Sequence, residues 1–157
     1  MMKYLQKLGK AIMLPVAVLP VAAIMMGIGY AMCPATMQGG DVTGIVQING
    51  FALVKIGSAV IDKLTMLFAV GVAIGLSKDQ HGAAGLAGLV AFLTVTTVLN
   101  SGVVATMMGA EEAPLAFSKI DNAFIGIISG ITASVCYNKF SSAQLPTALA
   151  FFSGKRC

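Results

Sequence analysis

The chain has 157 residues, of which 57% are hydrophobic and only 10% are charged. About a quarter of the residues of a soluble domain are charged, so this composition favours a lipid bilayer as the surrounding solvent. The net charge is +4, but the basic residues are scattered singly among apolar stretches, which excludes a patch for binding nucleic acid.

Uncharged stretches predict about four transmembrane helices, because a membrane helix needs about 20 apolar residues. We expect spans near residues 11–32, 62–77, 83–100 and 122–138. The second is short, since only 14 residues separate Lys63 from Lys78. The preceding stretch, 51–61, contains Lys55 and predicts an interfacial amphipathic helix leading into that span. The expected fold class is therefore an all-α polytopic integral membrane protein, with residues 1–157 forming a single membrane domain.

The distribution of charge predicts the orientation of these spans. With the N-terminus inside, the inner segments hold seven basic residues and one acidic residue, whereas the outer segments hold three basic and five acidic residues. Cytoplasmic loops of membrane proteins are enriched in Lys and Arg. We therefore expect a multi-pass protein of the cell membrane with both termini in the cytoplasm.

Two prolines, Pro15 and Pro20, interrupt the first apolar stretch in the segment LPVAVLPVAA. A membrane helix tolerates proline at its start, or in its interior where neighbouring helices satisfy the freed carbonyls. Bent helices also line substrate routes in transporters. Both interpretations are open, and we favour a simple bend over a direct role in transport.

Two GxxxG patterns lie on predicted spans, Gly71 with Gly75 and Gly126 with Gly130. Small residues one turn apart allow two helix backbones to approach closely. The patterns indicate helix packing within one chain, which we favour, or dimerisation. The glycine-rich GAAGLAG segment does not have the GxGxxG spacing of a phosphate-binding loop.

Several segments resemble one family in its own order. They are LGKAIMLPVAVLPVAAIMMGIG, then LFAVGVAIGLSKDQHGAAGLAG, then DNAFIGIISGITASVCYNKF followed by LPTALAFFSGKR. Together they resemble the enzyme IIC component of bacterial phosphoenolpyruvate-dependent sugar phosphotransferase systems, in the glucose, maltose and N-acetylglucosamine group. The SKD segment is most similar to the glucose and N-acetylglucosamine branch.

The resemblance implies a permease that carries a sugar inward while partner domains, enzymes IIB and IIA, phosphorylate it. Family members continue beyond the GKR segment to a Thr-Glu-Pro stretch and a histidine that contact the sugar, and no Thr-Glu-Pro occurs here. We therefore expect the N-terminal, scaffold and dimerisation half, truncated before the sugar-binding half and with no identifiable substrate-binding residue. The alternatives are a non-transporting structural or regulatory half-permease subunit and an inactive remnant.

The remaining chemical groups suggest no catalytic site and no cofactor. His81 is either a phosphoacceptor or, as we favour, a solvated loop residue, because the family's phosphorylated histidine belongs to a separate soluble domain. Cys33, Cys136 and Cys157 have no CxxC spacing and no nearby histidine, so we expect free thiols and no metal site.

Overall fold

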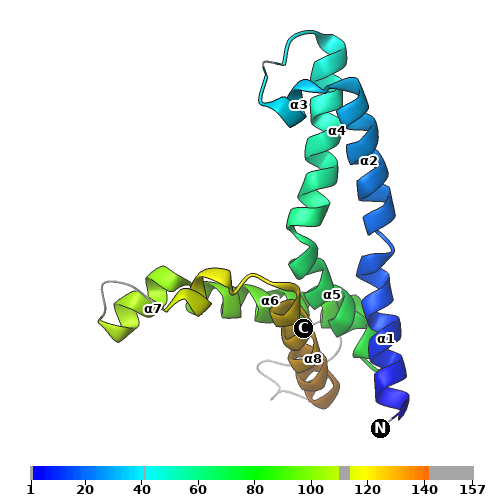
Figure 1. Ribbon diagram of the computed structural model, residues 1–157. Coiled ribbons are helices and arrows are strands. Elements are labelled where there is room, and N and C mark those ends of the chain that lie inside the picture. Colours follow the sequence, from blue (N-terminus) through cyan, green and yellow to red (C-terminus); the bar gives the residue numbers. More distant parts are fainter. Residues whose placement is uncertain (1, 41, 110–113, 142–157) are drawn as a thin grey trace, which may run out of the picture. The chain divides into compact units, whose positions relative to one another are not determined.

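The computed structural model describes residues 2–40, 42–109 and 114–141, and these ranges are helical without a β-strand (Figure 1). In chain order the helices are α1 Met2–Val16, α2 Leu19–Met32, α3 Ala35–Gln38, α4 Ile45–Asp62, α5 Leu64–Leu76, α6 Gly82–Val98, α7 Ser101–Met108, the 3-10 helix η1 Leu115–Lys119, and α8 Ala123–Phe140. The predicted all-α fold class is confirmed.

Three helical stretches of the described chain are long and apolar enough to cross a membrane. They are Met2–Met32, which joins α1 and α2, then Ile45–Asp62, and Ala123–Phe140. The pair α6 and α7 passes the same test, with a bend of 54° between the two helices. These three to four candidate spans confirm the expected polytopic membrane protein.

Helix α4 differs from the interfacial helix that we expected over residues 51–61. It runs for 18 residues and has the length and hydropathy of a membrane span. The Lys55 ammonium lies 5.3 Å from the centroid of the Phe51 ring, and the negative face of that ring stabilises a cation placed over it. The following helix, α5, has 13 residues, which at about 1.5 Å per residue is shorter than the hydrocarbon core.

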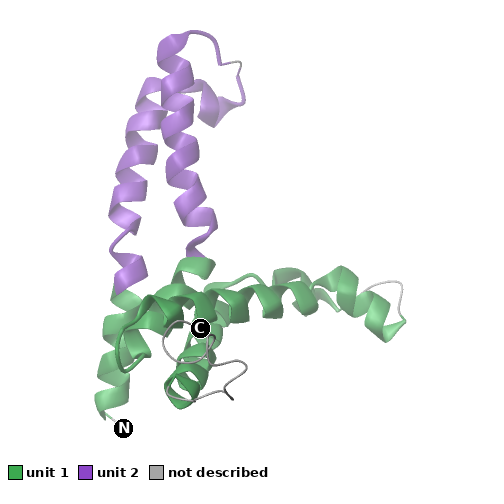
Figure 2. Cartoon of the chain, turned by 180° about the vertical axis from the view of Figure 1, so that it is seen from behind, with its two compact units in different colours: residues 1–13, 65–157 green, residues 14–64 purple. Residues whose placement is uncertain are grey.

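The chain forms two compact units (Figure 2). The hairpin unit, residues 14–64, consists mainly of α2 and α4 packed against each other. Glycines make this contact close: a Cβ on Gly29 would lie 2.7 Å from the Gly50 carbonyl oxygen, and one on Gly57 would lie 2.7 Å from the Ala22 carbonyl oxygen. Because the later residue of α2 meets the earlier residue of α4, the two helices are antiparallel. Large apolar side chains point away from the contact, among them Val21, Ile24, Ile28, Ile48 and Ile56.

The bundle unit, residues 1–13 and 65–157, contains the first part of α1 and the helices from α5 onward. Its core lies along α5, where Phe68, Ala69, Val72 and Ala73 are buried. Helices α6 and α8 pack against each other and add Phe92 and other buried side chains to this core.

Asparagine side chains fix where two helices of the bundle unit begin. The Asn100 side chain accepts a hydrogen bond from the Gly102 amide at the start of α7, and the Asn122 side chain accepts one from the Ile125 amide at the start of α8. Such caps satisfy amides that have no partner inside the helix. As the N-cap residue, Asn100 stabilises the start of α7 immediately after the end of α6.

Candidate functional site

Helix α5 packs against both α6 and α8, which also pack against each other, and small residues bring the three backbones together. Ala69 of α5 is fully buried. A Cβ on Gly88 of α6 would lie 2.6 Å from the Ala69 carbonyl oxygen, and one on Gly130 of α8 would lie 2.7 Å from the same atom. Both distances are shorter than any real carbon–oxygen contact of this kind. Glycine is thus needed on both neighbours of α5.

Three of the four glycines in the predicted GxxxG patterns contact another helix of the same unit. A Cβ on Gly126 would collide with the Thr65 carbonyl oxygen, and one on Gly75 would collide with Ala11 of α1. Gly130 meets Ala69, while Gly71 is half-buried on α5. The contacts support packing within one chain as the role of these glycines, and the dimerisation alternative stays a prediction.

Polar contacts join the two ends of α5 to the corresponding ends of α8. At the N-terminal ends, the Thr65 hydroxyl donates to Asp121 Oδ1 at 2.6 Å. At the C-terminal ends, Asn138 Nδ2 donates to the Leu76 carbonyl at 3.2 Å, and Asn138 Oδ1 accepts from the Lys78 amide at 2.8 Å. The two helices are therefore parallel. Helix α6 runs in the opposite direction, because the earlier Gly85 meets Ile74 and the later Gly88 meets Ala69.

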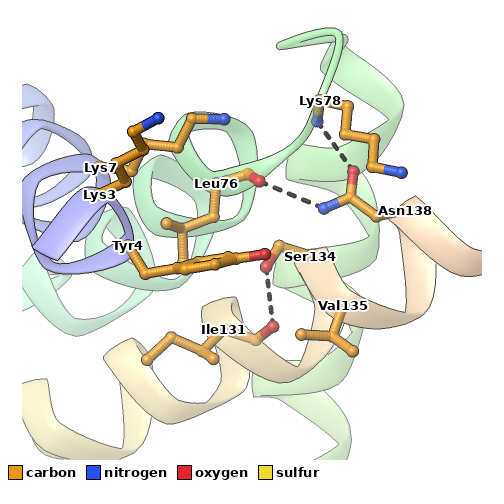
Figure 3. Close-up of a pocket in the computed structure, with 9 residues that line it drawn as sticks. All are labelled: Lys3, Tyr4, Lys7, Leu76, Lys78, Ile131, Ser134, Val135 and Asn138. Atoms are coloured by element: carbon orange, nitrogen blue, oxygen red, sulfur yellow. Dashed lines mark hydrogen bonds between the residues drawn. The ribbon is translucent and has the colours of Figure 1, made fainter. Parts of the chain in front are cut away.

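A pocket of about 370 Å³ opens where α5 and α8 end (Figure 3). Its polar lining comes from Lys3, Tyr4 and Lys7 of α1, from Lys78 after α5, and from Ser134 and Asn138 of α8. Three apolar side chains, Leu76, Ile131 and Val135, complete the wall. We call this place the lysine pocket.

Two of the polar side chains that line the lysine pocket, Ser134 and Asn138, are hydrogen-bonded within the described chain. The Ser134 hydroxyl donates to the Ile131 carbonyl at 2.8 Å, and both ends of the Asn138 amide are engaged as described above. The Tyr4 ring extends from α1 toward Ser134 (Figure 3). The three lining lysines are exposed, and none of the described residues that line the pocket is acidic. Chemically, such a pocket suits an anion with an apolar portion.

His81 lies in the described loop between α5 and α6 and caps the helix that follows. Its Nδ1 accepts a hydrogen bond from the Ala83 amide at 3.2 Å, so the imidazole caps the N-terminus of α6. The nearby Asp79 accepts a hydrogen bond from the Tyr137 hydroxyl at 3.2 Å. The described contacts of His81 thus explain its position by helix capping, and the phosphoacceptor alternative stays untested.

None of the described cysteines and prolines is among the residues that line the lysine pocket. Cys33 is a buried free thiol and Cys136 is an exposed one, while Cys157 lies outside the described residues. Pro15 lies in the last turn of α1, where its carbonyl accepts from the Val18 amide at 3.3 Å. Pro20 lies in the first turn of α2, where a missing amide leaves no intrahelical bond unmade. Both prolines thus flank the break between α1 and α2.

The sequence interpretation missed the residues that tie α5 to α8, namely Thr65, Asp121 and Asn138. One signal was available for Asn138, because an amide within an apolar helix needs a hydrogen-bond partner. Its partners, however, lie about 60 residues earlier in the chain and follow no local pattern.

Comparison with known proteins gives one family. The model of the family "Phosphotransferase system, EIIC" matches residues 9–157. The chain is 38% identical over 158 residues to the PTS system N-acetylglucosamine-specific EIICB component of Bacillus subtilis strain 168, which covers 99% of this chain and 28% of the relative. It is 35% identical over 164 residues to the PTS system glucose-specific EIICBA component of Staphylococcus carnosus strain TM300, which covers 97% of this chain and 24% of the relative. The chain thus spans about a quarter of the length of these relatives.

Proposed function

Because the chain belongs to the EIIC family of the phosphotransferase system, we propose that it forms the N-terminal membrane scaffold of a sugar permease. The observation that carries this proposal is the family match over residues 9–157. The close packing of α5 against α6 and α8 supports a scaffold role, since it holds three helices in fixed register. In this proposal the sugar-binding residues come from a further part of the permease.

The proposed substrate is glucose or N-acetylglucosamine, and the proposed partners are the IIB and IIA components that phosphorylate the sugar. Support comes from the names of the relatives, which are glucose-specific or N-acetylglucosamine-specific and combine EIIC with a B component or with B and A components. We also propose a homodimer. Its contacts would use surfaces other than the glycine faces of α5 and α8, which are occupied within the chain.

We propose further that the end of the bundle unit with the lysine pocket faces the cytoplasm. Lys3, Lys7, Lys78 and Lys139 gather at this end, through the pocket and the last turn of α8. At the opposite ends of α5 and α8, Lys119 of η1 is balanced by Asp121, which is bonded to Thr65. Basic residues are enriched on the cytoplasmic side, and this orientation agrees with both termini being cytoplasmic.

A chimera tests the proposed function. The segment of the Bacillus subtilis relative that matches this chain is replaced by residues 1–157, and the chimera is expressed in cells without their own glucose and N-acetylglucosamine permeases. We expect phosphoenolpyruvate-dependent uptake of radiolabelled N-acetylglucosamine well above that of the empty cells. The intact relative serves as the positive control.

The contrary result is a chimera that reaches the membrane in the same amount as the intact relative and takes up no sugar. That outcome would show that residues 1–157 cannot replace the corresponding membrane segment of the relative. It would favour the alternative of a structural or regulatory subunit, or of an inactive remnant.

A further inference from the structure

We propose that the lysine pocket binds the phosphate headgroup of an anionic phospholipid of the phosphatidylglycerol type. The proposed ligand is a component of the surrounding membrane. The inference therefore stands whether or not the chain takes part in sugar transport.

The charge of the pocket selects an anion. Lys3 and Lys7 line it from α1 and extend their ammonium groups in the same direction, and Lys78 lines it from the segment after α5, with its ammonium group beyond Asn138 (Figure 3). Among the lining residues that the structure describes, none carries a carboxylate. The nearest acidic neighbour in sequence, Asp79, accepts a hydrogen bond from Tyr137 and does not line the pocket. A phosphodiester thus meets positive charge from two elements.

The bonds of Asn138 keep one side of this cation cluster in place. Its side chain holds the Lys78 amide at 2.8 Å and the Leu76 carbonyl at 3.2 Å. The chain leaving α5 is therefore fixed against α8, and the Lys78 side chain starts from a defined point at the rim. A preorganised cation requires less ordering when the ligand binds.

An apolar track leads away from the pocket and identifies the ligand as a lipid. Val135 lines the pocket and is 60% exposed, and Ile128 and Phe124 are 44% and 69% exposed on the same helix. Spacings of four and seven residues place these side chains on one face of α8. From position 135 to position 124 the face extends about 16 Å along the helix. An acyl chain has room along this track, whereas a free phosphate makes no use of it.

The location in the helices agrees with a lipid headgroup. The pocket lies at the ends of α5 and α8, where lysines and the 79% exposed Tyr4 surround it. Lysine and tyrosine side chains are typical of the membrane–water interface, and basic pockets between membrane helices bind anionic headgroups.

Native mass spectrometry of the detergent-solubilised chain tests the proposal. The protein is titrated separately with phosphatidylglycerol and with phosphatidylcholine of the same acyl composition, and the two apparent affinities are compared. We expect a preference for phosphatidylglycerol of about tenfold or more, since each lysine near a phosphate contributes about a fivefold factor. Equal affinities would overturn the proposal.

Two double variants separate the pocket from surface charge in general. Lys7→Gln with Lys78→Gln removes two pocket cations and should reduce the preference to near unity. Lys10→Gln with Lys139→Gln removes the same charge from α1 and α8 outside the pocket lining and should retain the preference. A similar loss in both double variants would overturn the proposal, because it would show non-specific attraction.

Two further variants guard against misfolding as an explanation. Lys7→Gln alone changes an exposed residue of α1 and should lower the preference about fivefold. Lys7→Arg with Lys78→Arg keeps the charge and should bind as the unaltered protein does. Unchanged binding by the Lys7→Gln protein would count against the proposal.

Competition with free inorganic phosphate distinguishes a site for a lipid phosphate headgroup from a site for a soluble phosphate compound. At millimolar concentration it should leave bound phosphatidylglycerol in place, because it lacks the contacts with Val135 and the rest of the track. Displacement of the lipid by phosphate at concentrations comparable to those of the lipid would identify a site for a soluble phosphate compound and reject the lipid.

Discussion

Ala69 is a residue at which three helices of the bundle unit meet. Gly88 and Gly130 approach its carbonyl oxygen from α6 and α8, and neither position has space for a methyl group. Without water in the bilayer core, such close contact replaces the hydrophobic effect as the source of helix association. Local sequence identified Gly130 as a packing candidate, but its partner depends on the tertiary fold and could not be read from the GxxxG pattern.

The first prediction concerns Gly130. Gly130→Ala should destabilise the protein by about 1–3 kcal/mol, because the added Cβ would lie 2.7 Å from the Ala69 carbonyl oxygen and 2.9 Å from Val72 Cβ. The measurement is unfolding in mixed micelles followed by circular dichroism. The matched control is Gly27→Ala in α2, where an added Cβ would meet no described atom within 4 Å outside its own stretch of helix. The control should be neutral or slightly stabilising, and an equal loss in both variants would refute the packing account.

Asn138 is the second residue on which the bundle unit depends, because it bonds to both Leu76 and Lys78. Asn138→Ala should lower the free energy of unfolding by about 1–3 kcal/mol, since the Leu76 carbonyl loses its side-chain donor. Asn49→Ala, at an exposed position of α4, serves as the control in the same unfolding measurement. An Asn138→Ala protein as stable as this control would show that the amide does not tie α5 to α8.

At the scale of helices, α5 is short but is held at both ends by a longer parallel helix. Its 13 residues are bonded to α8 through Thr65 at one end and Leu76 at the other. Uncharged stretches in the sequence predicted apolar segments here and at α6 and α8. The sequence did not predict the extent of α4, because a charged residue such as Lys55 argues against a membrane span. The contact of Lys55 with the Phe51 ring forms only in the folded helix and could not be read from the sequence.

A double-mutant cycle tests the link at the N-terminal ends of α5 and α8. Thr65→Val and Asp121→Ala each remove one side of the hydrogen bond between the Thr65 hydroxyl and Asp121. We expect a coupling free energy of about 0.5–1.5 kcal/mol between the two changes. Thr94→Val with Asp121→Ala is the control, because the Thr94 hydroxyl bonds only to its own helix at the Val90 carbonyl. Strict additivity of Thr65→Val and Asp121→Ala would contradict the proposed link.

At the scale of the whole molecule, α5 and α8 run in one direction through the bundle unit and α6 runs in the opposite direction. The family was predictable from the order of the sequence motifs, and the membrane character was predictable from the hydropathy of the residues. The lysine pocket was not predictable, because Lys3, Lys7 and Lys78 appear in the sequence only as separate flanking charges and meet through the packing of α1 against α5.

Cysteine accessibility in intact cells tests this arrangement most directly. In a protein whose native cysteines are replaced by serine, Gly82→Cys reports on the α5–α6 loop and Ser118→Cys on η1, both at exposed positions. We expect a membrane-impermeant maleimide to label Ser118→Cys in intact cells and Gly82→Cys only after the membrane is permeabilised. The reverse pattern would contradict the proposed orientation, and equal labelling of both sites in intact cells would contradict a membrane crossing between them.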